Sequence, residues 1–176
     1  LLPDQKTTYY PIVSLLEAQQ YEQLVTYAKT RGNRLPNRVN FILDEFGNFT
    51  AIPDIQSKMT VGGGYGIRWN LFIQDFNQLI DKYGQEVAKI IQSNCHFWIY
   101  LHSQDNSTNK EISDRLGKYT TSTYSLGGTT QKYAAPSSST NIQLSERSLL
   151  FPDEVAIIQR PYQIVTSIYK PVVMKS

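Results

Sequence analysis

An apolar run in the first third of the chain ends in two adjacent carboxylates. Residues 38–43 read Arg-Val-Asn-Phe-Ile-Leu, and Asp44 and Glu45 follow directly. The run predicts a strand buried on both faces of a parallel sheet, and open α/β sheets bind ligands at the carboxyl ends of their strands. In phosphoryl transfer the first acid can hold Mg²⁺, while the second orients and deprotonates the attacking water. The structural alternative is a strand followed by an acidic turn.

A glutamine further along the chain strengthens the chemical interpretation. Residues 67–74 predict a second buried strand that ends at Gln74. The acidic pair resembles the second acidic motif of RecA-like ATPases, usually called Walker B. In such a sheet the Gln74 amide would lie beside the phosphate site, where it could bond the γ-phosphate or the attacking water. The alternative is a turn residue whose amide is satisfied locally.

The composition is that of one globular domain with a sizeable core. The chain has 176 residues, of which 40% are hydrophobic and 18% charged, and its net charge is +2. No run of Lys and Arg signals a nucleic-acid surface, although a few basic residues per subunit can line the channel of a ring. Cys95 is the only cysteine, which excludes an internal disulfide and favours a reducing compartment. No apolar stretch reaches the roughly 20 residues of a membrane span. The opening Leu-Leu-Pro-Asp has no initiator Met and suggests a piece of a longer protein, cut in or just after a strand.

Strands and helices are predicted to alternate through residue 117. The expected helices are 12–30, 54–61 closed by Gly62–Gly64, a short one capped by Asp75, 85–93, and one that begins at a Thr108–Glu111 capping box and ends at Gly117; the expected strands are 39–44, 67–74 and 96–101. This order predicts an α/β fold, with a mostly parallel sheet and helices on both faces.

The composition changes after Gly117. Residues 118–146 are rich in Ser, Thr, Tyr and Gly and are expected to form edge strands or loops, with a flexible loop at 134–139. A short helical turn is expected from Pro152 and a final strand at 162–168.

The ordered set of short motifs resembles the type IV secretion coupling proteins, the TraG/TraD group of conjugation ATPases. The matches cover nearly the whole chain. In order they are Phe41–Asn48 (Phe-Ile-Leu-Asp-Glu-Phe-Gly-Asn), Ile52–Asp54, Gly66–Arg68, Gln74, Gln78–Leu79, Lys82–Gly84, Ile91, Asn94–Cys95, Leu101, Gln104–Asp105, Thr108, Glu111–Ser113, Leu116–Gly117, Arg147–Leu150 and Pro152–Glu154.

The resemblance implies a membrane-anchored, hexameric ATPase that hands a relaxase-bound single DNA strand to a type IV secretion channel. By position, Asp44 would be the Mg²⁺ ligand, Glu45 the general base, and Gln74 the phosphate sensor, with ATP and Mg²⁺ as cofactors of the full-length protein. The protein would work at the cytoplasmic face of the membrane. Residues 1–176 would be the C-terminal part of its RecA-like domain, and this piece alone would be soluble and could be monomeric.

The sequence departs from the family pattern at two places. No phosphate loop (Gly-x-x-x-x-Gly-Lys-Ser/Thr) occurs, so the fragment alone is expected to have little or no ATPase activity. Residues 62–66 lack the arginine that relatives tend to carry there. Arg68 and Arg147 are the remaining candidates for a transition-state arginine, and neither is favoured. Two alternatives stay open: another ring ATPase, such as a segregation motor or helicase, and a non-catalytic docking module that receives relaxase or channel proteins on residues 119–146.

Overall fold

The chain divides into two compact units between His96 and Phe97 in the computed structural model. The structure describes residues 9–129, 137–168 and 171–175. The elements of the first unit are α1 (Tyr10–Thr30), β1 (Val39–Leu43), α2 (Ile55–Tyr65), β2 (Ile67–Leu71), α3 (Asn77–Tyr83) and α4 (Gln85–Asn94).

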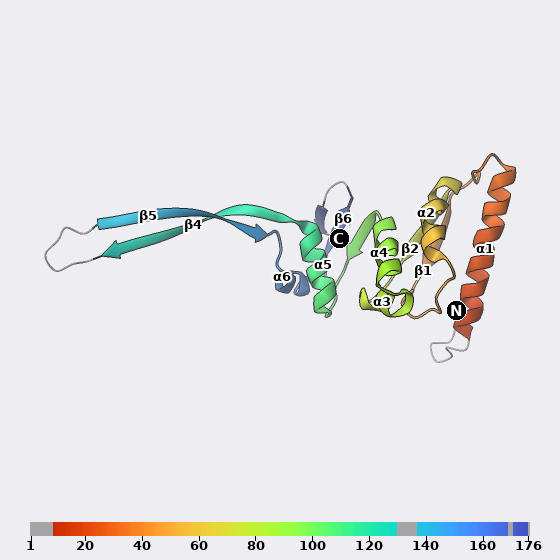
Figure 1. Cartoon of the computed structure of the whole chain (residues 1–176), viewed down its shortest axis with the longest axis horizontal. Coiled ribbons are helices and arrows are strands. Elements are labelled where there is room, and N and C mark those ends of the chain that lie inside the picture. The colour runs from red at the N-terminus through yellow and green to blue at the C-terminus, as the bar shows by residue number, and fades with distance from the viewer. Residues whose placement is uncertain (1–8, 130–136, 169–170, 176) are drawn as a thin grey trace. The chain divides into compact units, whose positions relative to one another are not determined.

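Strands β1 and β2 form a parallel pair joined through α2 (Figure 1). Val39 is opposite Ile67, and Leu43 is opposite Leu71, so both strands end at the same edge. A parallel pair joined by a helical crossover is the βαβ unit that the strand–helix alternation predicts.

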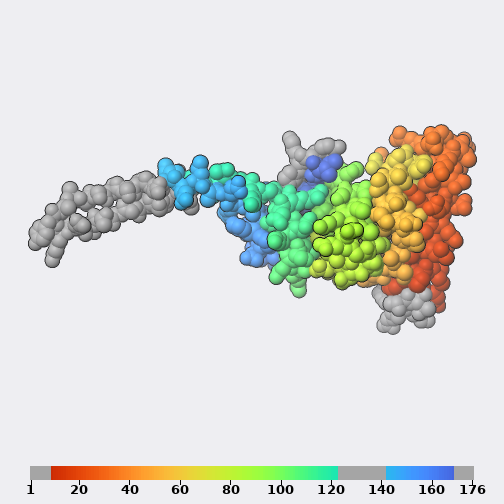
Figure 2. All heavy atoms as spheres, in the orientation of Figure 1, coloured from red at the N-terminus to blue at the C-terminus, as the bar shows by residue number. Residues whose placement is uncertain are grey.

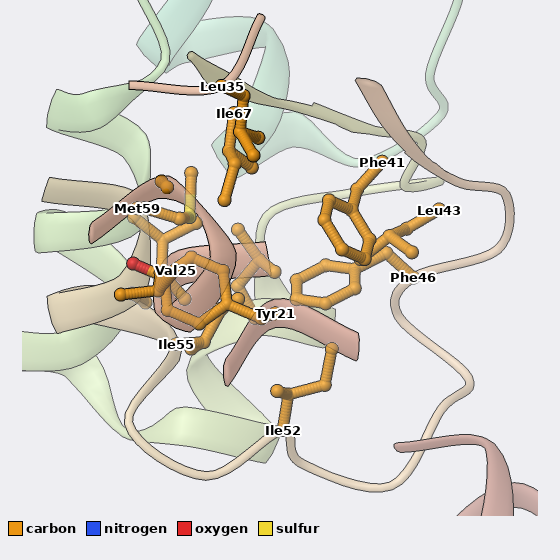
Figure 3. Close-up of a cluster of buried hydrophobic side chains, with 14 residues drawn as sticks. Tyr21, Val25, Leu35, Phe41, Leu43, Phe46, Ile52, Ile55, Met59 and Ile67 are labelled. Carbon is orange, nitrogen blue, oxygen red and sulfur yellow. The ribbon is translucent and has the colours of Figure 1, made fainter. Parts of the chain in front are cut away.

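One face of β1 packs on the core of the first unit. Phe41 and Leu43 are buried and contact residues from the helices, and Figure 3 shows Phe41 pointing into this cluster. Ile42, on the opposite face, is 67% exposed. The prediction that the strand is buried on both faces is therefore wrong for the part of the chain that the structure describes, because successive side chains alternate between faces and only one face is covered.

Helix α2 continues through the glycines that were expected to end it. It runs to Tyr65, and Gly66 closes it in the left-handed conformation with φ of 91°. Gly62 lies inside the helix, where an added Cβ would be 3.3 Å from the Trp69 indole nitrogen of β2. A residue without a side chain therefore lets α2 lie close against β2, which outweighs its low helix propensity.

The second unit combines an antiparallel sheet with a long hairpin. Its elements are β3 (Phe97–Tyr100), α5 (Asn106–Leu116), β4 (Lys118–Thr129), β5 (Ser137–Ser148), α6 (Pro152–Ala156), β6 (Tyr162–Ser167) and β7 (Pro171–Lys175). The sheet order is β3-β6-β7, and both pairings are antiparallel. Among the described strands, the parallel pairing that the sequence predicts is therefore observed only between β1 and β2. Strand β7 had no counterpart in the sequence prediction.

Strands β4 and β5 pair antiparallel from Lys118 with Ser148 to Thr129 with Ser137. Ser137–Ser139 therefore belong to a strand, not to the expected flexible loop, while residues 134–136 lie outside the described residues. At the base of the hairpin Leu149 N–H donates to Gly117 O at 2.9 Å, and in Figure 2 the coloured base of the hairpin follows directly on α5.

Helix α5 begins one turn earlier than the capping-box prediction. Asp105 is its N-cap and accepts the Thr108 N–H at 2.8 Å. The Asp105 side chain also accepts hydrogen bonds from Ser107, and these bonds lower its pKa to about 2. Thr108 and Glu111 therefore lie inside the helix.

Candidate functional site

The acidic pair lies in an exposed loop that is pinned to the end of β2. Asp44 and Glu45 follow β1 directly and are exposed, whereas Phe46 is fully buried. Phe46 N–H donates to Phe72 O at 2.8 Å, and Phe72 N–H donates to Leu43 O at 3.0 Å. These two bonds extend the β1–β2 pairing by one step, so the acidic loop and the segment after β2 leave the same edge of the sheet.

Glu45 has a constrained backbone and an oriented carboxylate. Its φ is 52°, in the left-handed region that residues other than glycine rarely adopt. Its N–H donates to Asp44 Oδ1 at 3.1 Å. Asn48 Nδ2 donates to Glu45 Oε2 at 3.0 Å, and Asn48 N–H donates to Glu45 O at 2.8 Å. Asn48 therefore closes the turn on the Glu45 backbone and orients the Glu45 carboxylate through one side-chain bond.

Gln74 does not end a strand, because β2 stops at Leu71. Gln74 is an exposed loop residue, and its N–H donates to Gln78 Oε1 at 3.2 Å. Beyond it, Asp75 Oδ1 accepts the Gln78 N–H at 3.0 Å, which satisfies one backbone donor in the first turn of α3. The loop still emerges from the edge that carries Asp44, as the role predicted for Gln74 requires.

Helix α3 contacts both loops. The Gln78 side chain lies against Gly47, since a Cβ added to Gly47 would be 2.0 Å from Gln78 Oε1. The Lys82 ammonium donates to the carbonyls of Gly47 and Phe49, and burial lowers its pKa. Sequence reasoning included Asn48, Gln78 and Lys82 among the matching positions but assigned them no role.

The donor set fits a magnesium ion that is bound with a nucleotide. Asp44 is exposed, and its Oδ1 accepts the Glu45 N–H. Among the described residues no group of three or more His, Cys, Asp or Glu could hold a metal. Mg²⁺ that is held by one or two carboxylates with phosphate and water needs no such cage. Asp44, with Glu45 beside it, would hold the ion, and the ion would supply charge neutralisation at the phosphates.

Neither arginine candidate gains support as a transition-state group. Arg147 donates to Glu154 Oε1 at 2.8 Å and lies over the Phe151 ring at 5.0 Å. Arg68 is an exposed residue within β2. No helix in the described ranges is both long and apolar enough to cross a membrane.

Comparison with known proteins places the chain in a family. Residues 38–160 match the family described as the TraM recognition site of TraD and TraG. VirD4 of Bartonella quintana, a type IV secretion system-coupling protein, is 29% identical over 128 residues, which are 72% of this chain and 20% of that protein. The conjugal transfer protein TraG of Escherichia coli is 27% identical over 161 residues, covering 86% of this chain and 25% of TraG.

Solved structures of the conjugative coupling protein TrwB have the same fold. The unbound form aligns with a TM-score of 0.70 at 17% identity, over 94% of this chain and 36% of TrwB. A complex of TrwB with a non-hydrolysable ATP analogue aligns with a TM-score of 0.65 at 18% identity, over 94% of this chain and 37% of TrwB. The expected RecA-like α/β class is confirmed.

The family match covers most of the chain, and the TrwB structures share its fold. The chain belongs to the TraG/TraD family of type IV secretion coupling proteins. It spans about a fifth to a quarter of the length of the curated relatives it matches.

Proposed function

We propose that this chain is part of an ATP-driven translocase that delivers relaxase-bound single-stranded DNA to a type IV secretion channel. The observation that carries the proposal is the common edge of β1 and β2, from which the loops bearing Asp44, Glu45 and Gln74 all emerge. Ligands of α/β sheets bind at this edge. TrwB, which shares the fold, has been solved with an ATP analogue and with ADP and Mg²⁺. These complexes support the proposal that the complete protein binds a nucleotide and Mg²⁺.

Each residue has a distinct role in this proposal. The Asp44 carboxylate would hold Mg²⁺, directly or through water, and the ion would neutralise charge at the phosphates. Glu45 is the general base and takes a proton from the attacking water. Its hydrogen bond from Asn48 helps to orient the carboxylate toward that water. Gln74 donates or accepts a hydrogen bond at the γ-phosphate or that water. The phosphate loop, which the sequence lacks, would come from another segment of the complete coupling protein.

The assembly and partners follow the same proposal. The complete protein would act as a homo-hexamer anchored to the membrane, with the motor on its cytoplasmic face. ATP and Mg²⁺ would be its cofactors, and the relaxase–DNA complex and the channel proteins its partners.

Substituting Glu45→Gln in the complete coupling protein tests the function. The variant keeps the size and hydrogen-bonding capacity of the side chain but removes the base. We expect ATP affinity to be retained, and ATP hydrolysis and DNA transfer between cells to be lost. Glu86→Gln, the same change at an exposed residue of α4, is the control and should transfer DNA normally. Normal transfer by the Glu45→Gln protein would refute the motor role.

Docking is the second candidate, and the β4–β5 hairpin favours it. Ile142 and Leu144 are 59% and 72% exposed and lie on the same side of β5. Exposed apolar side chains on an extended ribbon are suited to bind a partner protein, and the matched family is described as a TraM recognition site. The double variant Ile142→Thr, Leu144→Thr should then lose DNA transfer while ATP hydrolysis is unchanged, and unaffected transfer would refute docking there.

A further inference from the structure

We propose that Gln78 is a positioning residue that couples the loop of the acidic pair to the loop of Gln74. The inference rests on the proposed ATPase function, because it assigns a residue that sets the geometry of that site. Gln78 does not carry out chemistry itself. It acts through Gln74 on one side and through Gly47 on the other.

The Gln78 side chain bonds one loop and packs against the other. Its Oε1 accepts the Gln74 N–H at 3.2 Å. A Cβ on Gly47 would lie 2.0 Å from this same oxygen and 3.0 Å from Gln78 Cβ, so the side chain occupies the space that glycine leaves open. Gly47 is two positions after Glu45, within the turn that Asn48 closes on the Glu45 carboxylate.

The rest of α3 fixes Gln78 in this position. Asp75 accepts the Gln78 N–H and holds the first turn. One turn later, Lys82 donates to the carbonyls of Gly47 and Phe49 and so ties the helix to the acidic loop. Leu79, on the buried face between them, is 2% exposed and belongs to the core of the first unit. The helix is therefore held on three sides, and Gln78 has little freedom to move independently of the two loops.

A displacement of one loop must reach the other through these contacts. Suppose that Gln74 shifts when its side-chain amide contacts the γ-phosphate, or the water that replaces it after hydrolysis. The bond from the Gln74 backbone N–H then moves Gln78 as well, and Gln78 presses on Gly47. Glu45 then moves relative to the attacking water, and misplacement of a catalytic group by about 1 Å can cost about 100-fold in rate. Gln78 should consequently affect the rate of hydrolysis far more than nucleotide affinity.

A matched pair of substitutions tests the coupling in the complete coupling protein. Gln78→Met keeps the length of the side chain and removes the acceptor, whereas Gln78→Glu keeps an oxygen that can accept the Gln74 N–H. We expect Gln78→Met to lower kcat for ATP about 10-fold or more with KM changed less than about twofold, and Gln78→Glu to stay within about threefold of wild type. A purely structural role would not produce this rescue.

Hydrogen exchange of the Gln74 backbone N–H gives a readout that does not depend on activity. It should speed up in Gln78→Met and remain slow in Gln78→Glu, because only the latter keeps the bond. Gly47→Ala displaces the Gln78 amide from the other side and should repeat both effects of Gln78→Met. This variant keeps the test decisive if Gln78→Met does not fold, since Gly47 has no left-handed φ that would penalise alanine.

The outcomes separate the coupling from the function on which it rests. If the wild-type protein hydrolyses ATP and both Gln78→Met and Gly47→Ala have the same kcat, the coupling is overturned. A wild-type protein without ATP turnover would overturn the proposed function instead. In that case faster Gln74 exchange in Gln78→Met would still support the connection between the loops, and unchanged exchange would overturn it.

Discussion

At the scale of single residues, neighbours in the fold determine what the acidic pair can do. Glu45 is held at φ of 52° by a turn that ends at Asn48, and Asn48 bonds the carboxylate itself. The sequence could predict Asp44 and Glu45, because two acids after an apolar run are a local pattern. It could not predict Gln78, whose importance comes from contact with Gly47, far away in the chain.

Substituting Asn48→Ala in the complete coupling protein should slow ATP hydrolysis with little change in ATP affinity. The variant removes the hydrogen bond to Glu45 Oε2, which is 3.0 Å long and solvent-exposed. We expect the loss of this orienting bond to raise the activation free energy of hydrolysis by about 1 kcal/mol. That corresponds to a decrease of about fivefold in kcat. Steady-state kinetics would check this, and an equal loss of nucleotide affinity would argue against an orienting role.

Glu17 should make the stability of the chain depend on pH. It lies on α1, its Oε2 is buried and has no hydrogen-bond partner among the described residues, and burial raises its pKa from 4.5 to about 7. The folded state therefore keeps a proton that the unfolded state loses above pH 4.5, and the free energy of unfolding falls as pH rises from about 4.5 through 7.

Glu17→Gln removes the charge and should raise the melting temperature at pH 8 but have less effect at pH 4.5. Thermal unfolding of both proteins across this range measures the difference. A stabilisation by Glu17→Gln that is equal at both pH values would contradict a buried, titrating carboxyl.

At the scale of helices and strands, the order of elements was predictable but several ends were not. Periodicity and end signals located α1, β1, β2, α4 and β3 to within a few residues. The errors have tertiary causes. Gly62 is accommodated inside α2 because it packs against Trp69 of β2, and the segment after β2 turns into α3, whose first turn Asp75 hydrogen-bonds.

The three glycines of α2 should respond differently to alanine. In the part of the chain that the structure describes, no atom lies within 4 Å of a Cβ added to Gly63 or Gly64, whereas at Gly62 the Trp69 nitrogen would lie 3.3 Å away. Gly63→Ala should therefore stabilise the chain by about 0.5–1 kcal/mol, because alanine favours the helix and restricts the unfolded chain. Gly62→Ala should gain nothing or destabilise. Urea unfolding measures both, and equal stabilisation by the two variants would contradict the close packing of α2 on β2.

At the scale of the whole molecule, the motif series was sufficient to predict the class of protein. Many short matches in fixed order constrain the family more than any one of them, and the family match over residues 38–160 confirms it. The pairing of β3 with β6 in an antiparallel sheet was not predictable, because it joins segments far apart in the sequence and neither has a local signal for its partner.

The 176-residue chain by itself should not hydrolyse ATP. The sequence has no phosphate loop, so the lysine and backbone cradle that bind the β- and γ-phosphates are missing. A coupled-enzyme assay on the purified chain, with the complete coupling protein as positive control, measures this. Turnover by the purified chain that is abolished by Glu45→Gln would show that these residues form a sufficient site and would refute the expectation.

The most direct test of the account is the position of the metal ion. We expect a crystal structure of the complete coupling protein with Mn²⁺ and a non-hydrolysable ATP analogue to show an anomalous peak beside the Asp44 carboxylate, in contact with it directly or through one water. The Glu45 carboxylate and the Gln74 amide should face the γ-phosphate. An ordered Mn²⁺–nucleotide complex bound elsewhere, with Asp44 and Gln74 remote from the phosphates, would contradict it.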